Sequence, residues 1–261
     1  MALRIDRALE SFRLNASAVD RLLEFDRVVL DVAVSGLREL ENQLESRHLH
    51  SAVPLVRNRA TLLENLKTTD SLRPQYETIF NQCIVLLVSY FTSAQHTLFR
   101  DAVVAALNLN ADVPASSEEL KMSWRGIVQA EIDQEEMFTE LLIAQQNISF
   151  QDMQSVSRAF AKHLQINVEK TLDVNDIIMG HAARHVIAHA GGVVDRKMIS
   201  QVKDAIPRTL KETLLEGEAV RFSPEEVRRL AASMVNHLTT LTATVVMVVE
   251  RWAVTNKYGG F

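Results

Sequence analysis

The chain of 261 residues is 47% hydrophobic and carries a formal net charge of -5, which gives ample apolar surface for a packed core and argues against nonspecific coating of nucleic acid. Its single cysteine, Cys83, excludes an internal disulfide framework and fits a reducing compartment. No signal peptide is visible, and the most apolar runs, residues 83–88 and 241–249, are shorter than the roughly 20 residues that span a membrane. With only 8 Gly and 5 Pro, the composition favours an all-helical protein. The short apolar runs, the lone cysteine and the lack of a visible signal peptide lead us to expect a soluble, cytoplasmic one.

The first helical region is predicted to begin at a cap on Asn15 or Ser17 and to run to about residue 47. Apolar residues follow a heptad-like spacing, interrupted at Asp26, at Val19, Leu23, Leu30, Ala33, Leu37, Leu40 and Leu44. Such a stripe packs on its own domain in most proteins; the alternative is a coiled-coil or dimer contact. Ser51 with Pro54 predicts a second helix, ending near residue 67.

Turn residues at positions 69–74 place a domain boundary between a helical N-terminal extension, residues 1–72, and a helical bundle, residues 73–261. The bundle begins with a helix over residues 75–108 that is apolar nearly all round and is therefore expected at its centre. Further helices are expected to start at Ser116 with Glu119, at Ser149, at Asp173 or Asn175, at Asp195 and, with the clearest signal, at residues 223–226.

The most informative stretch is residues 181–195, in which three of the eight histidines surround an arginine and a Gly-Gly pair follows. Glycine ends helices, so these histidines are expected in the last two turns of a helix. Arg184 and His189 have the spacing R-x-x-x-x-H. Five residues turn a helix by about 500°, which leaves the two about 140° apart, so they share a site only if the arginine curls round or the helix unwinds.

This pair of residues suits RNA cleavage. A histidine with a pKa of about 6.5 can accept the proton of a ribose 2′-hydroxyl at neutral pH. A guanidinium can hold the scissile phosphate and stabilise the charge that develops there. Because RNA supplies its own nucleophile, neither a metal nor another cofactor is needed. The same spacing recurs at Arg158 and His163, but without a polar neighbour after the arginine or a glycine pair after the histidine.

Residues 184–195, Arg-His-Val-Ile-Ala-His-Ala-Gly-Gly-Val-Val-Asp, resemble the motif of HEPN-superfamily ribonucleases, most closely the RiboL-PSP-HEPN-like branch. A looser resemblance covers residues 82–250. The resemblance to this family implies a helical bundle that forms a homodimer, in which the motifs of the two copies meet in one composite site. The implied activity is metal-independent endoribonucleolysis that leaves 2′,3′-cyclic phosphate and 5′-hydroxyl ends, as in toxins and antiviral effectors, with an antitoxin or regulatory protein as a partner.

By the same resemblance, Arg184 and His189 would be catalytic and His185 would support them. Two positions depart from the family pattern. His185 stands where asparagine is commonest, so its role is less defined. Gly191 stands where some family toxins carry a tyrosine that a nucleotidyltransferase partner modifies, so control by that route is not expected.

Two alternatives use the same stretch differently. His181, His185 and His189 repeat at i, i+4 and i+8, a spacing seen in metal sites, although one ion can reach only two of three ligands that span about 12 Å. The remaining ligands would come from His96, His163, His237, Glu131 or Asp133. The other alternative is a catalytically silent interaction or RNA-binding module. For RNA binding, the basic residues after the motif are expected to form a rim, above all Arg196, Lys197 and Lys203, joined by Arg208 and Lys211.

Overall fold

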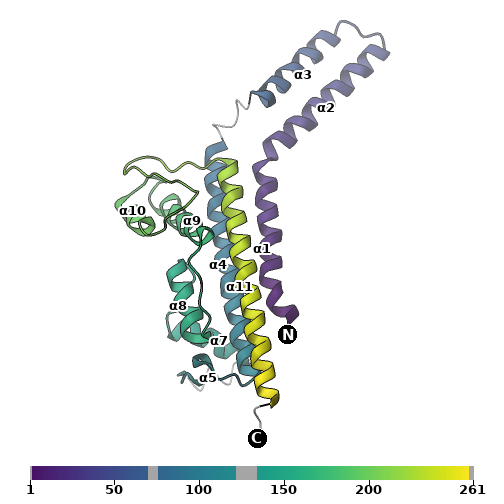
Figure 1. Cartoon of the computed structure of the whole chain (residues 1–261). Helices are drawn as coiled ribbons and strands as arrows, with labels where there is room; N and C mark the ends of the chain where they lie inside the picture. The colour runs from purple at the N-terminus through teal and green to yellow at the C-terminus, as the bar shows by residue number, and fades with distance from the viewer. Residues whose placement is uncertain (1, 70–75, 122–133, 259–261) are drawn as a thin grey trace.

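A computed structural model describes residues 2–69, 76–121 and 134–258 (Figure 1). The protein is 75% helical, and the described residues contain no strand, only an isolated bridge between Val193 and Ala219. The predicted all-α fold is thus confirmed. The helices are α1 (Ala2–Leu23), α2 (Phe25–Ser46), α3 (Val53–Thr68), α4 (Glu77–Asn108), α5 (Pro114–Ser117), α7 (Gln134–Gln145), α8 (Met153–Leu164), α9 (Leu172–His189), α10 (Arg196–Val202) and α11 (Pro224–Tyr258).

The bundle is built around α4, which lies alongside α1 and α11 and packs against α9 as well (Figure 1). Its apolar residues are buried on almost every side, as the sequence predicts for a central helix. Phe91 lies at the middle of this packing and meets the ring of Phe12 from α1 edge to face, with ring centroids 5.8 Å apart. Cys83 is fully buried in the same core, and burial raises the pKa of its thiol to about 11, so it serves packing.

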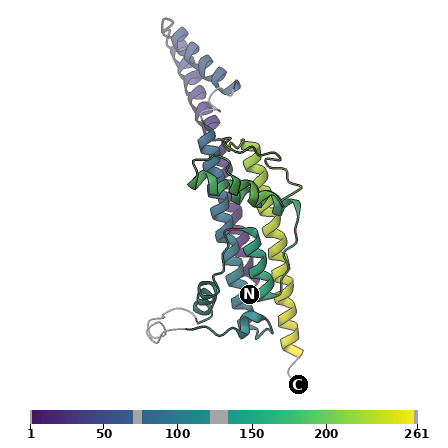
Figure 2. The ribbon, with the colours of Figure 1, turned by 90° about the vertical axis from the view of Figure 1, so that its left-hand side faces the viewer.

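Helix α1 belongs to the bundle, which differs from the expected division at residue 72. Ile5, Phe12 and Leu23 are fully buried against the core. The helix begins at Ala2, so Asn15 and Ser17 lie inside it and do not cap it. It ends at Leu23, and the single non-helical residue Glu24 separates it from α2. Only α2 and α3 extend beyond the bundle, as a hairpin that projects from one end (Figures 1 and 2).

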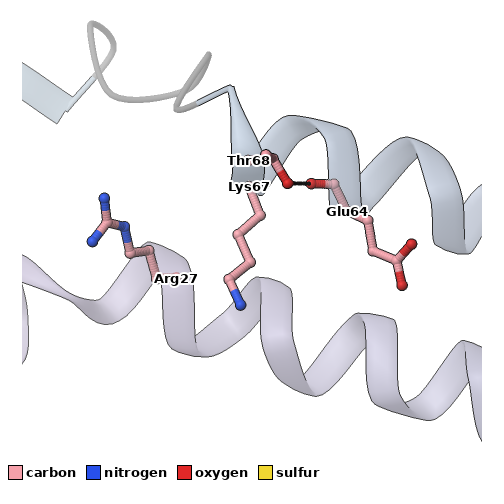
Figure 3. Close-up of a pocket in the computed structure, with 4 residues that line it drawn as sticks. All are labelled: Arg27, Glu64, Lys67 and Thr68. Carbon is pink, nitrogen blue, oxygen red and sulfur yellow. Dashed lines mark hydrogen bonds between the residues drawn. The ribbon is translucent and has the colours of Figure 1, made fainter.

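The seam of the α2–α3 hairpin combines half-buried apolar residues with ion pairs. Leu30, Ala33, Leu37 and Leu44 of the predicted stripe are half-buried in the hairpin, so this part of the stripe serves intrachain packing. Arg38 joins α2 to Glu64 of α3 at 2.8 Å, and Lys67 pairs with Asp31. At the root of the hairpin, Arg27, Glu64, Lys67 and Thr68 line an open hollow of about 340 Å³, into which Lys67 reaches from α3 toward α2 (Figure 3).

Some of the predicted helix starts are confirmed and others are wrong. At α11, Ser223 and Glu226 form the reciprocal capping bonds that their spacing predicts. No helix starts at Ser116 with Glu119, because α5 ends at Ser117 and residues 118–121 are not helical. The caps of α8 and α9 are Asp152 and Thr171, instead of the predicted Ser149, Asp173 or Asn175. Both have extended backbones, and the side chain of each accepts a hydrogen bond from the backbone N–H three residues further along the chain.

One helix in the described part of the chain, α11, is long and apolar enough to cross a membrane, judged by length and composition only. Within its most apolar window, 44% of the residues are buried inside the bundle. The core helix of a helical bundle meets the same criterion, and α11 packs along both α1 and α4.

Candidate functional site

The motif helix α9 remains α-helical through His189 and then ends in a glycine turn. The backbone N–H groups of Ala190 and Gly192 both donate to the carbonyl of Val186, at 2.9 Å each. Gly191 and Gly192 have φ angles of +64° and +73°, which side chains rarely tolerate, so the glycine pair makes this turn possible. Because the helix does not unwind before the glycines, Arg184 and His189 keep the angular separation of about 140° that their spacing gives.

The two residues nevertheless border one solvent-facing strip of α9. Val186 and the two residues Ala182 and Ala183 are buried, which fixes the inner side of the helix. On the outer side, Arg184 is at one edge and His189 is at the other, with Ala188 and His185 between them. The side chain of Ala188 is small and exposed, so the strip is open to solvent at that position. No hydrogen bond or ion pair occupies Arg184 among the described residues.

His185 lies within this strip and joins it to α10. Its ring centroid is 5.3 Å from that of His189, and its Nε2 atom is 3.2 Å from Nζ of Lys197. Since a lysine ammonium can only donate, this contact makes Nε2 the acceptor of a neutral imidazole. The pKa of His185 is lowered by desolvation, and further by the charge of Lys197 and by His189. The site therefore combines a permanent guanidinium, an ammonium and two imidazoles.

We expect Lys197→Met to raise the pKa of His185, because the substitution removes a neighbouring positive charge and keeps the length of the side chain. The measurement is a titration of the imidazole nitrogens of His185 by NMR. Lys203→Met is the matched control, since Lys203 is exposed and does not contact His185. An unchanged titration midpoint in Lys197→Met would show that the two side chains do not interact in solution.

The third histidine of the motif helix, His181, is buried and separated from the other two by its environment. Its ring faces Phe91 of α4 at 6.1 Å, its Nε2 atom has no hydrogen-bond partner, and burial lowers its pKa to about 4. His237 of α11 packs against the same phenylalanine at 5.8 Å. His181 is therefore a core residue, while His185 and His189 are on the surface.

This arrangement bears on the metal alternative. The described residues contain no group of three or more His, Cys, Asp or Glu side chains placed to hold a metal ion. Of the further ligands considered, His96 packs against Phe150 at 5.2 Å and His163 lies in the core. Glu131 and Asp133 lie outside the described residues. The metal alternative thus rests on His185 and His189 alone.

The second R-x-x-x-x-H copy has the opposite environment from the first. His163 is only 1% exposed, packs against Phe99 and lies 3.8 Å from a carboxylate oxygen of Glu118. Its pKa is lowered, mainly by desolvation. Arg158 is exposed on the other side of α8, where it bonds to Ser155. A substrate on the surface therefore has no access to His163.

The expected basic rim divides into two groups. Arg196 and Lys197 at the start of α10 and Lys203 at its end are exposed, although Arg196 also pairs with Glu216 at 3.0 Å. Arg208 instead holds a chain segment together, because its guanidinium donates to five backbone carbonyls at 3.1–3.3 Å, those of Val202, Ala205, Leu210, Lys211 and Glu212. Lys211 pairs with Glu226 and lies over the ring of Phe222. These last two residues serve the structure.

The segment that Arg208 organises, residues 203–223, forms a strap across the end of the motif. Val194 N–H donates to the carbonyl of Glu218 at 2.8 Å, and Val220 N–H donates to that of Gly192 at 2.7 Å. At its other end, the strap is held by the carboxylate of buried Asp176 in α9. Sequence reasoning missed Asp176 and the role of Arg208, because both act on backbone groups that no side-chain pattern reveals.

Comparison of the chain with models of known protein families, with curated proteins and with solved structures finds no match.

Proposed function

We propose that this protein is a metal-independent endoribonuclease whose catalytic groups are Arg184 and His189, with His185 in support. The observation that carries the proposal is the solvent-facing strip at the end of α9, where a guanidinium and an imidazole border an open helical surface. Lys197 adds a further cation to the strip from α10. The resemblance of residues 184–195 to the HEPN ribonuclease motif points to the same two residues.

In this mechanism, the 2′-oxygen of a ribose attacks the adjacent phosphorus while His189 accepts the 2′-hydroxyl proton. The bond from phosphorus to the 5′-oxygen then breaks, and that oxygen takes a proton from an acid, leaving a 2′,3′-cyclic phosphate and a 5′-hydroxyl. Arg184 stabilises the negative charge that builds on the phosphate oxygens. In the family that the motif resembles, a second copy completes the site, and its His189 would supply the acid.

His185 and Lys197 have a positioning role in this proposal. A neutral His185 that accepts from Lys197 holds the ammonium above the strip, where it can meet the phosphate next to the scissile one. Arg196 and Lys203 extend the positive charge along the RNA backbone. We place the activity in the cytoplasm, as toxin-type growth control or antiviral defence. An antitoxin or other regulatory protein would then hold it in check.

The test is an RNA-cleavage assay in excess EDTA, with analysis of the product ends. Cleavage that persists and leaves 2′,3′-cyclic phosphates is the expected result. Loss of cleavage in EDTA with recovery on adding a divalent metal would overturn the proposal in favour of a metal site that includes His185 and His189. Absence of cleavage across single-stranded and structured RNA, with RNA binding retained, would favour a silent binding module.

A further inference from the structure

The α2–α3 hairpin carries apolar side chains that its own chain does not cover. In α2, Phe25 and Val32 are 61% and 70% exposed, and Val28 and Val29 are 54% and 49% exposed. These residues are on a different side of α2 from the seam with α3. Around the axis of α2, the two sides are about 100° apart. A helix that is apolar on two sides is typical of a buried position. Because the hairpin projects beyond the bundle, no other described element covers this second side (Figures 1 and 2).

A glycine continues the same stripe. Phe25, Val29, Val32 and Gly36 follow the spacing i, i+4, i+7 and i+11, so they form one line along α2. Glycine weakens a helix interior relative to alanine. Nothing in the described part of the chain requires it here, since a Cβ atom at position 36 would have no neighbour within 4 Å. The missing side chain leaves room at this position for a close approach by another chain.

We propose that α2 pairs with α2 of a second copy of this chain, antiparallel, about a two-fold axis between Leu30 and Asp31. In this register, Val29 of one copy lies opposite Val32 of the other, and Phe25 lies opposite Gly36. The largest side chain of the stripe thus meets the residue that has none, and the two valines meet at the centre. The stripe is therefore complementary to itself, as a contact about a two-fold axis requires.

The contact joins two hairpins into a four-helix arrangement and covers the second apolar side of α2. It involves α2 and no residue of α9, so it does not depend on the proposed cleavage chemistry. If two copies also meet at the motif of α9, that contact is additional to the hairpin contact. The mass of the complex would then be a multiple of the mass of the dimer that the hairpins form.

The experiment compares the full chain with Val32→Glu by sedimentation-velocity and light-scattering mass. Val32 is exposed in the single chain, so the charge does not disturb the fold, which circular dichroism checks. In the proposed contact, however, the substitution buries two unpaired carboxylates, one from each copy. We expect the mass of the native complex to fall two-fold. Leu55→Glu on the exposed side of α3 is the matched control and should keep the native mass.

A second variant tests the register. Val29→Lys combined with Val32→Glu puts each new ammonium opposite a new carboxylate of the other copy only if the two helices run antiparallel as proposed. The mass should return to the native value at low salt and fall again as salt rises. A native chain that is monomeric, or a native mass retained by Val32→Glu, would overturn the contact. A double variant no heavier than Val32→Glu would overturn the register.

Discussion

Replacing His189 by alanine is expected to lower the rate of RNA cleavage by about 10³-fold, the usual contribution of a positioned general acid or base. His189 is exposed at the last turn of α9, where its ring lies beside that of His185, so its removal takes away a proton acceptor without opening the core. Helical content and thermal midpoint should remain those of the native protein. Single-turnover cleavage of a labelled RNA measures the effect.

Two matched controls separate chemistry from the loss of a histidine or arginine as such. His50→Ala removes an exposed histidine at the turn of the α2–α3 hairpin, and Arg158→Ala removes the exposed arginine of the second motif copy. Both variants should cleave at the native rate. The idea fails if His189→Ala retains full activity, or if a folded His163→Ala variant loses activity while His189→Ala does not.

The sequence predicts where helices form much better than it predicts which helices pack against one another. The apolar periodicity of α4 and the capping residues of α11 predict both helices because the signals are local. The turn residues at 69–74 predict a domain boundary there, whereas the break that separates α1 from α2 is the single residue Glu24, which carries no turn signal in the sequence. The place of α1 beside α4 and α11 depends on distant residues such as Phe91, with which Phe12 packs.

The candidate site shows the same limit at the level of side chains. His181, His185 and His189 have equivalent spacing, yet only the first is buried, because α9 turns that residue toward Phe91. Neither the contact of Lys197 with His185 nor the burial of His163 can be read from spacing alone. Both depend on how separate helices dock.

Replacing Asp176 by alanine is expected to lower the free energy of unfolding by about 4 kcal/mol. The carboxylate is 2% exposed and accepts from the backbone N–H of Thr209 at 2.7 Å, from its hydroxyl at 2.6 Å and from the N–H of Leu210 at 3.0 Å. Each hydrogen bond to a charged group contributes about 1.5–3 kcal/mol, and such contributions are not fully additive. The alanine variant leaves these donors without their acceptor.

Urea denaturation measures this loss, with Asp204→Ala as the matched control. Asp204 is exposed on the same strap, so its replacement should change the free energy of unfolding by no more than about 0.5 kcal/mol. Asp176→Asn retains one acceptor oxygen and should lose about half as much as Asp176→Ala. Equal stabilities of Asp176→Ala and Asp204→Ala would show that the strap is not anchored through this carboxylate.

The Asp176 variant also separates the support of the site from its chemistry. Without the carboxylate, the strap should open locally, which would speed hydrogen exchange at Thr209 and Leu210, and then at Val220, whose N–H donates to Gly192 at the end of the motif. Cleavage should fall because the glycine turn after His189 loses its partner. His189→Ala should lower cleavage by about 10³-fold with native exchange at the same amides. If both variants lose activity but neither changes exchange, Asp176 acts on the site by a route other than the strap.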